Sequence, residues 1–110
     1  MNRISYLAHR GLWHQKYVEN TIEAFQNCLN SLSPKCHGFE CDLREIEFEG
    51  KRIWVIFHDE TLARFSDKSE PIKPKTLLKQ NKKTGTLPTL EEFKLFCKSI
   101  RKKITINIEI

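Results

Sequence analysis

Four short runs of apolar or alternating residues, each of strand length, constrain this chain more than any other feature of its sequence. They lie at residues 4–8, 39–43, 53–57 and 104–110, and stretches with apolar residues at helical spacing precede the second and the fourth run, at 21–32 and 89–101. This order is typical of an α/β protein with a parallel sheet, in which ligands gather at the carboxyl ends of the strands. The sequence therefore predicts a parallel α/β fold with a polar rim.

Local signals mark the beginning of both helices. Asn20 with Glu23 resembles a capping box, and Thr89 with Glu92 repeats the pattern before the second helix. Two connections carry no such pattern. Residues 66–87 contain many lysines and few apolar residues, which predicts a long surface loop with at most one short helix. Residues 43–52 are expected to form an irregular connection that returns the chain to the opposite rim.

Length and apolar content exclude several classes of protein. The 110 residues suffice for one domain with a packed core, and 39% of them are hydrophobic. No apolar run has the length of a secretory signal or a membrane span, so we expect a cytoplasmic protein without an integral membrane segment. The four cysteines show no C-x-x-C pair and are expected to be small buried side chains, neither catalytic nor in disulfides: Cys28, Cys36, Cys41 and Cys97.

The net charge of +5 is concentrated in one segment. Residues 68–103 contain ten Lys and one Arg against three Glu, which is net +8. Such a segment suits nucleic acid, anionic lipid or a phosphorylated substrate. Its lysines are not interleaved with aromatic residues between Lys68 and Thr89, so a solvated surface is the simplest interpretation and no nucleic-acid partner is expected.

Titratable residues stand at or near the ends of all four predicted strands. They are His9 and Arg10, Glu40 and Asp42, His58, and Glu109. Two carboxylates at i and i+2 on one strand face are close enough to share a hard cation such as Ca²⁺ or Mg²⁺. Histidines act as acid and base near neutral pH, and arginine suits bidentate contact with phosphate. Together these residue types favour cleavage of a phosphoester.

Each of these residues also has a simpler explanation. Glu40 and Asp42 could form the solvated face of an antiparallel sheet. His58 with Asp59 could be an ordinary turn, and Glu109 could lie in a frayed end. We assign no chemistry to the remaining histidines, His14 and His37.

Six motifs in sequence nevertheless resemble the glycerophosphodiester phosphodiesterase family. They are Ala8-His9-Arg10-Gly11, Glu19-Asn20-Thr21, Glu40-x-Asp42, His58-Asp59-x-Thr61-Leu62-x-Arg64, Leu87-Pro88-Thr89-Leu90-Glu91-Glu92 and Ile106-Asn107-Ile108-Glu109-Ile110. The resemblance implies a (β/α)8 barrel related to that of phosphatidylinositol-specific phospholipase C. It also implies hydrolysis of small glycerophosphodiesters to an alcohol and glycerol phosphate, with Ca²⁺ or Mg²⁺. It further implies that His9 and His58 form the acid and base pair, that Arg10 contacts phosphate, and that the metal ligands are Glu40, Asp42 and Glu109.

Length limits this interpretation. A (β/α)8 barrel needs about 250 residues, so residues 1–110 are expected to be a partial domain, the amino-terminal half with about four strands. We expect either part of a longer enzyme or a half-barrel completed by another chain. The alternatives are an inactive fragment that binds a phosphorylated ligand, a cation or a partner chain, and a basic module that binds nucleic acid or anionic lipid.

Overall fold

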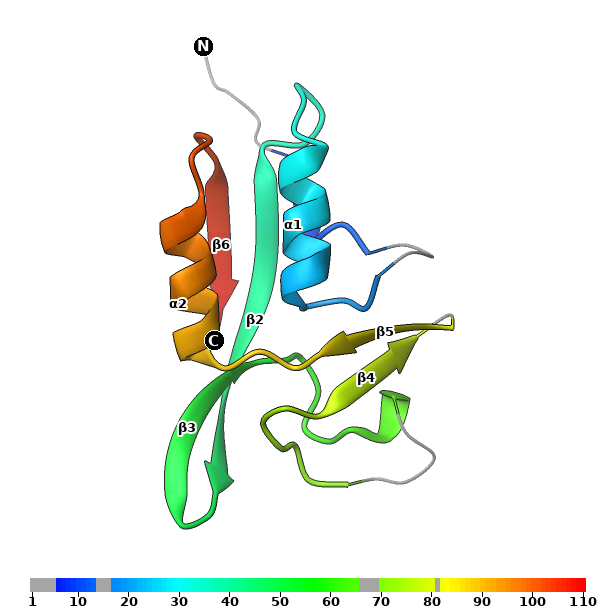
Figure 1. Ribbon diagram of the computed structural model, residues 1–110, viewed down its shortest axis with the longest axis vertical. Helices are drawn as coiled ribbons and strands as arrows, with labels where there is room; N and C mark the ends of the chain where they lie inside the picture. The colour runs from blue at the N-terminus through cyan, green and yellow to red at the C-terminus, as the bar shows by residue number, and fades with distance from the viewer. Residues whose placement is uncertain (1–5, 14–16, 66–69, 81) are drawn as a thin grey trace.

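The computed structural model describes residues 6–13, 17–65, 70–80 and 82–110. His14, the start of the strand predicted at 4–8, and the part of the predicted loop at 66–69 and 81 lie outside the described residues. The molecule is elongated, 48 × 30 × 25 Å, and has mixed α/β structure (Figure 1). Its elements follow the order β1 (Leu7–His9), α1 (Ile22–Asn30), β2 (Gly38–Phe48), β3 (Lys51–Ile56), the 3-10 turn η1 (Ala63–Phe65), β4 (Leu77–Gln80), β5 (Lys83–Thr86), α2 (Leu90–Ser99) and β6 (Thr105–Glu109).

The parallel part of the sheet is built around the first half of β2. Strand β1 pairs with residues 38–40 of β2, and β6 pairs with residues 38–42, both in parallel. Because both neighbours share residues 38–40, they lie on opposite sides of β2, as Figure 1 shows for β6. The predicted strands at 39–43 and 104–110 are thus confirmed as members of a parallel sheet, in which the structure makes them neighbours.

Both helices cover one face of this parallel sheet. Phe39 and Cys41 of β2 are fully buried against Phe25 of α1 and Phe93 of α2. The rings of Phe25 and Phe39 stack with their centroids 4.4 Å apart. The alternate residues of β2 therefore point to the opposite face, which carries no helix among the described residues.

Each helix is capped at its N-terminus by a threonine. Thr89 and Glu92 form the predicted capping box at α2. At α1 the prediction is wrong by one residue, because Thr21 caps the helix by accepting a hydrogen bond from Ala24 N. Asn20 instead adopts a left-handed backbone conformation, φ 55°, and its side chain turns to the sheet. Neither helix of the described part is long and apolar enough to cross a membrane.

The predicted connection at 43–52 is a β-hairpin, which corrects two expectations. Strand β2 continues to Phe48, and β3 pairs with it antiparallel, from Leu43 with Ile56 to Phe48 with Lys51. Glu49 and Gly50 both have positive φ, the conformation of a tight two-residue turn that suits the twist of a hairpin. The run predicted as a parallel strand at 53–57 is therefore the antiparallel return arm. Alternation from residue 45 to 48, followed by Gly50, is the signal for this hairpin.

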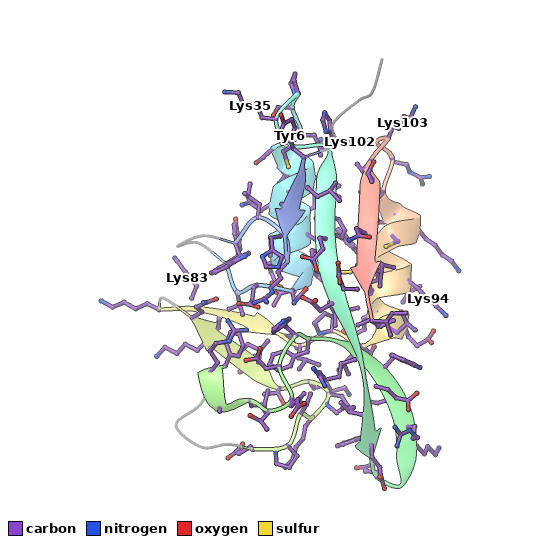
Figure 2. All side chains as sticks on the ribbon, turned by 180° about the vertical axis from the view of Figure 1, so that it is seen from behind. Tyr6, Lys35, Lys83, Lys94, Lys102 and Lys103 are labelled. Carbon is purple, nitrogen blue, oxygen red and sulfur yellow. The ribbon has the colours of Figure 1, made fainter. Side chains whose placement is uncertain are left out.

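The segment predicted as a surface loop at 66–87 also contains a hairpin. Strands β4 and β5 pair antiparallel, with Leu78 opposite Gly85. The hairpin belongs to a second apolar cluster, formed by Val18, Val55, Phe57, Leu62, Ile72, Leu78 and Leu87. A few well-spaced apolar residues thus suffice to order a lysine-rich segment. Three lysines of the basic segment, Lys83, Lys94 and Lys103, lie far from one another on the molecule (Figure 2).

The cysteines and His37 occupy structural positions. Cys28 and Cys41 are buried, as predicted, whereas Cys36 and Cys97 are partly buried; all four are free. The Nδ1 of His37 accepts a hydrogen bond from Tyr6 N at 2.9 Å.

Candidate active site

The register of the parallel strands places the candidate residues side by side. His9 of β1 is level with Glu40 of β2, which is level with Asn107 of β6. Two residues further on, Asp42 is level with Glu109. All these side chains alternate with the buried residues that face the helices, so they lie on the other face of the sheet.

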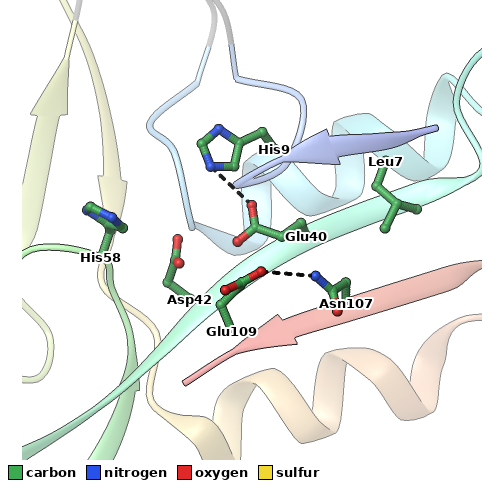
Figure 3. A pocket seen from close by; sticks show the side chains of 7 residues that line it. All are labelled: Leu7, His9, Glu40, Asp42, His58, Asn107 and Glu109. Carbon is green, nitrogen blue, oxygen red and sulfur yellow. Dashed lines mark hydrogen bonds and ion pairs between the residues drawn. The ribbon is translucent and has the colours of Figure 1, made fainter.

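These residues line one open pocket of about 530 Å³ (Figure 3). Its lining consists of Leu7, His9, Glu40, Asp42, His58, Asn107 and Glu109. His58 reaches it because β3 returns along β2, and just beyond β3 the Phe57 N–H donates to Asp42 O at 3.0 Å. The structure thus brings together five of the six predicted site residues from β1, β2, β6 and the segment after β3.

Glu40 lies at the centre of the pocket wall and has one oxygen to spare. Its side chain is 11% exposed; Oε2 lies 3.3 Å from His9 Nε2 and accepts a hydrogen bond from Arg10 N at 3.2 Å. Its Oε1 is buried and has no hydrogen-bond partner among the residues that the structure describes. Burial, followed by the charges of Asp42 and Glu109, raises the pKa of Glu40 in spite of His9. A cation beside Oε1 would relieve both the unpaired oxygen and the repulsion.

The other two carboxylates are engaged with amide groups. Asp42 Oδ2 accepts from Asn20 Nδ2 at 3.0 Å, and Asp42 N donates to Asn20 Oδ1 at 3.2 Å. Glu109 Oε1 accepts from Asn107 Nδ2 at 3.3 Å. In the part of the chain that the structure describes, no group of three or more His, Cys, Asp and Glu side chains forms a ready metal site. The oxygen donors are nevertheless of the kind that Ca²⁺ and Mg²⁺ take, and a carboxylate can accept more bonds than these.

Arg10 is the candidate that does not line the pocket. Its side chain is 15% exposed, with Nε 3.4 Å from Asp42 Oδ2 and Nη1 donating to Glu19 Oε2 at 2.8 Å. Its backbone is left-handed, φ 59°, and its carbonyl accepts a hydrogen bond from Asn20 N at 2.8 Å. The two ends of the connection between β1 and α1 are therefore held together beside the pocket, and Arg10 contributes positive charge next to Asp42.

The imidazole of His58 is held by the residue that follows it. Its Nδ1 lies 2.7 Å from Asp59 Oδ1. Asp59 is in turn bound by Arg64, whose Nε donates to Oδ2 at 2.8 Å. Hydrogen bonding from Arg64 is the main reason that the pKa of Asp59 falls to about 2, against the opposing effect of burial. Asp59 is thus a carboxylate at any pH where the histidine could work as a base.

Sequence reasoning gave no role to four residues that touch the site, although each lies within a quoted motif. Glu19 and Asn20 are buried polar residues that hold Arg10 and Asp42. Arg64 holds Asp59, and Asn107 contacts Glu109. The available signal was the run of polar residues from Glu19 to Thr21 just before an amphipathic helix. In the structure these three residues are buried, and buried polar side chains need hydrogen-bond partners.

Comparison with known proteins gives one similar structure. A glycerophosphodiester phosphodiesterase from Thermotoga maritima, solved as a crystal structure, matches this chain with a TM-score of 0.64 and 27% sequence identity. The match covers 98% of this chain and 44% of the Thermotoga protein. No protein-family model and no curated protein matches the sequence. This chain has the fold of part of a glycerophosphodiester phosphodiesterase and spans less than half of that enzyme.

Proposed function

We propose that this chain carries the catalytic half of a metal-dependent glycerophosphodiester phosphodiesterase, and that residues 1–110 are a partial domain of a (β/α)8 barrel. One observation supports this above all: His9 and His58, from different elements, line the same pocket as Glu40, Asp42 and Glu109. The likeness to the Thermotoga enzyme supports the same conclusion. In the proposal, β1, β2 and β6 are neighbouring barrel strands, and the pocket face is part of the lumen at the carboxyl ends of the strands.

The two histidines divide the proton transfers. One accepts a proton from the attacking water or from the neighbouring glycerol hydroxyl, and the other donates a proton to the oxygen of the leaving alcohol. His9 is adjacent to Glu40, and His58 is oriented by Asp59. Their imidazoles approach the pocket from two sides, as Figure 3 shows, which is the arrangement that acid and base on opposite sides of one phosphorus require.

Glu40, Asp42 and Glu109 are the proposed ligands of one Ca²⁺ or Mg²⁺ ion. The unpaired Oε1 of Glu40 and the mutual repulsion of the carboxylates support this assignment. When bound, the ion would stabilise the charge that develops on the phosphoryl oxygens. Arg10 is the proposed phosphate contact; Nε and Nη1 face Asp42 and Glu19, so Nη2 is the atom that we assign to the phosphate.

The test is to assay this chain in the context of a complete barrel. A chimera would carry this chain in place of the matching 44% of the Thermotoga enzyme, and release of glycerol phosphate from glycerophosphocholine would be measured with Ca²⁺ or Mg²⁺. We expect metal-dependent turnover, and a loss of at least about 100-fold in His9→Ala and in His58→Ala.

His37→Ala is the matched control, because His37 bonds to Tyr6 and does not line the pocket. It should retain activity. A folded chimera without turnover, or one in which His58→Ala retains wild-type turnover, would contradict the proposed function. The isolated chain serves as the second sample; we expect it to be inactive because an open half-barrel cannot hold these groups to the required precision.

A further inference from the structure

A continuous chain of ion pairs runs behind the pocket, from the proposed phosphate contact to one of the proposed catalytic histidines. Its members, in order, are Arg10, Glu19, Arg64, Asp59 and His58. We propose that Arg64, anchored on Glu19, is a positioning residue that orients Asp59 and thereby fixes which imidazole nitrogen His58 presents to the pocket. For its effect on catalysis this inference rests on the proposed function; for the state of His58 it does not.

Arg64 contacts two carboxylates through different combinations of its nitrogens. Nε and Nη2 donate to Asp59, at 2.8 and 3.2 Å, and Nη1 and Nη2 donate to Glu19, at 2.5 and 3.0 Å. Both contacts are bidentate, and only a planar guanidinium can make two such contacts at once. The rigid guanidinium of Arg64 therefore fixes the position of Asp59 relative to Glu19, although 45 residues separate Glu19 from Arg64.

Glu19 is a firm anchor because it is buried and fully engaged. Its side chain is 2% exposed and lies just before helix α1. Burial by itself would raise the pKa of Glu19, but hydrogen bonds and charge from Arg64, with those from Arg10, outweigh it and lower the pKa. Glu19 thus stays ionised and holds both arginines. Since the same carboxylate holds Arg10, it links the two sides of the candidate site.

His58 receives this positioning through Asp59. An ionised carboxylate beside Nδ1 can only accept a hydrogen bond there, so the neutral imidazole carries its hydrogen on Nδ1 and leaves the lone pair on Nε2. His58 lines the pocket, and Nε2 is the nitrogen that remains for the substrate. The backbone of the same residue is held independently, because Arg44 Nη2 donates to His58 O at 2.7 Å. Arg64 consequently affects the orientation and tautomer of the His58 ring, and not the position of the backbone.

Two other features of the molecule, a groove and a pair of thiols, give weaker support for a functional role. The groove between η1 and β4 adjoins a segment outside the described residues. The Cys28 and Cys36 thiols lie 3.6 Å apart, and burial together with the neighbouring thiol raises the pKa of Cys28 to about 12. A thiol with a raised pKa is a poor nucleophile. Each link of the ion-pair chain from Arg10 to His58, by contrast, is a direct contact.

The direct test reads the tautomer of His58 by 15N NMR on the full 110-residue chain, without substrate. We expect the Nδ1–H tautomer in the wild type at a pH where the ring is neutral. In Arg64→Gln the population of the Nε2–H tautomer should increase measurably, and Arg64→Lys should fall between the two because an ammonium cannot make both bidentate contacts. Amide spectra establish that each variant is folded.

Arg52→Gln is the matched control. Arg52 also pairs with a carboxylate, that of Glu45, but on the β2–β3 hairpin and with a side chain that is 67% exposed. It should leave His58 unchanged. A wild type with the Nε2–H tautomer, or an Arg64→Gln variant with the wild-type tautomer, would overturn the inference. If Arg64→Gln does not fold, Asp59→Asn with the same readout decides the question.

Kinetics in the chimera form the second test. Arg64→Gln should lower kcat about 10- to 100-fold with KM within about twofold, and Arg64→Lys should recover part of the loss. An unchanged kcat would refute the positioning role in catalysis. An inactive parent chimera would count against the proposed function alone, since the tautomer measurement still stands or falls by itself.

Discussion

The two faces of the parallel sheet are made by the same few residues of β2, yet they have opposite properties. Phe39 and Cys41 are completely buried between the helices, whereas Glu40 and Asp42 face a pocket of carboxylates and histidines. Strand alternation alone produces this division. The difference shows that stability and chemistry are separated by one residue along the chain: one face stabilises the fold, and the other accepts unfavourable charge repulsion.

The largest expected effect lies on the helix-covered face. Phe39→Ala removes a ring that stacks on Phe25 and should lower the free energy of unfolding by about 3 to 5 kcal/mol. Urea denaturation followed by circular dichroism would measure it. Leu95→Ala, at a position of α2 that is 68% exposed, is the control and should change little. Equal effects at both positions would contradict the assignment of this face as the core.

On the pocket face the expected effect depends on metal. Ca²⁺ at 100 times its dissociation constant should stabilise the wild type by about 2.7 kcal/mol, because the proposed site is assembled only in the folded chain. Glu40→Gln should abolish this stabilisation, whereas Glu45→Gln on the hairpin should retain it. Thermal unfolding with and without Ca²⁺ provides the measurement. The same stabilisation in Glu40→Gln would exclude Glu40 as a ligand.

A smaller effect concerns pH and the ion pairs behind the pocket. The pKa of Asp59 is lowered from 3.8 to about 2, so its stabilising contribution is complete above about pH 4 and is lost as the pH falls towards 2. With allowance for the partial exposure of Asp59, this contribution is about 1 to 2 kcal/mol. The stability difference between the wild type and Asp59→Asn should therefore shrink over that range.

Arg64→Gln should remove most of the same pH dependence, since Arg64 is the main cause of the lowered pKa. Denaturation curves at pH 6, 4, 3 and 2 would measure both comparisons. A difference between wild type and Asp59→Asn that is constant with pH would contradict the ion pair.

The smallest effect is expected on the hairpin. Arg52 and Glu45 form an ion pair of which the arginine side chain is 67% exposed, and water screens such pairs. Arg52→Gln should change the free energy of unfolding by no more than about 0.5 kcal/mol. A larger loss would show that the hairpin is stabilised by charge, unlike the helix-covered face.

Much of the site was accessible from the sequence because it follows a short-range rule. Alternation put Glu40 and Asp42 on one face, and Glu109 with Asn107 on one face of the last strand. The apolar run that ends at residue 57 located His58, although the direction of that strand was predicted incorrectly. His58 reaches the pocket from an antiparallel arm because β3 pairs only with residues 43–48 of β2, beyond the parallel part, and therefore ends beside the carboxyl end of that part.

Periodic and local features followed directly from the order of residues: the faces of β2 and β6, the capping box at Thr89, and the residue types of the pocket. The antiparallel direction of β3, the contact of Asn20 with Asp42 and the contact of Glu19 with Arg64 depended on the folded chain. Local periodicity depends only on neighbours in the chain. The partner of a buried charge, by contrast, is selected by burial and geometry among all the groups that folding brings within reach.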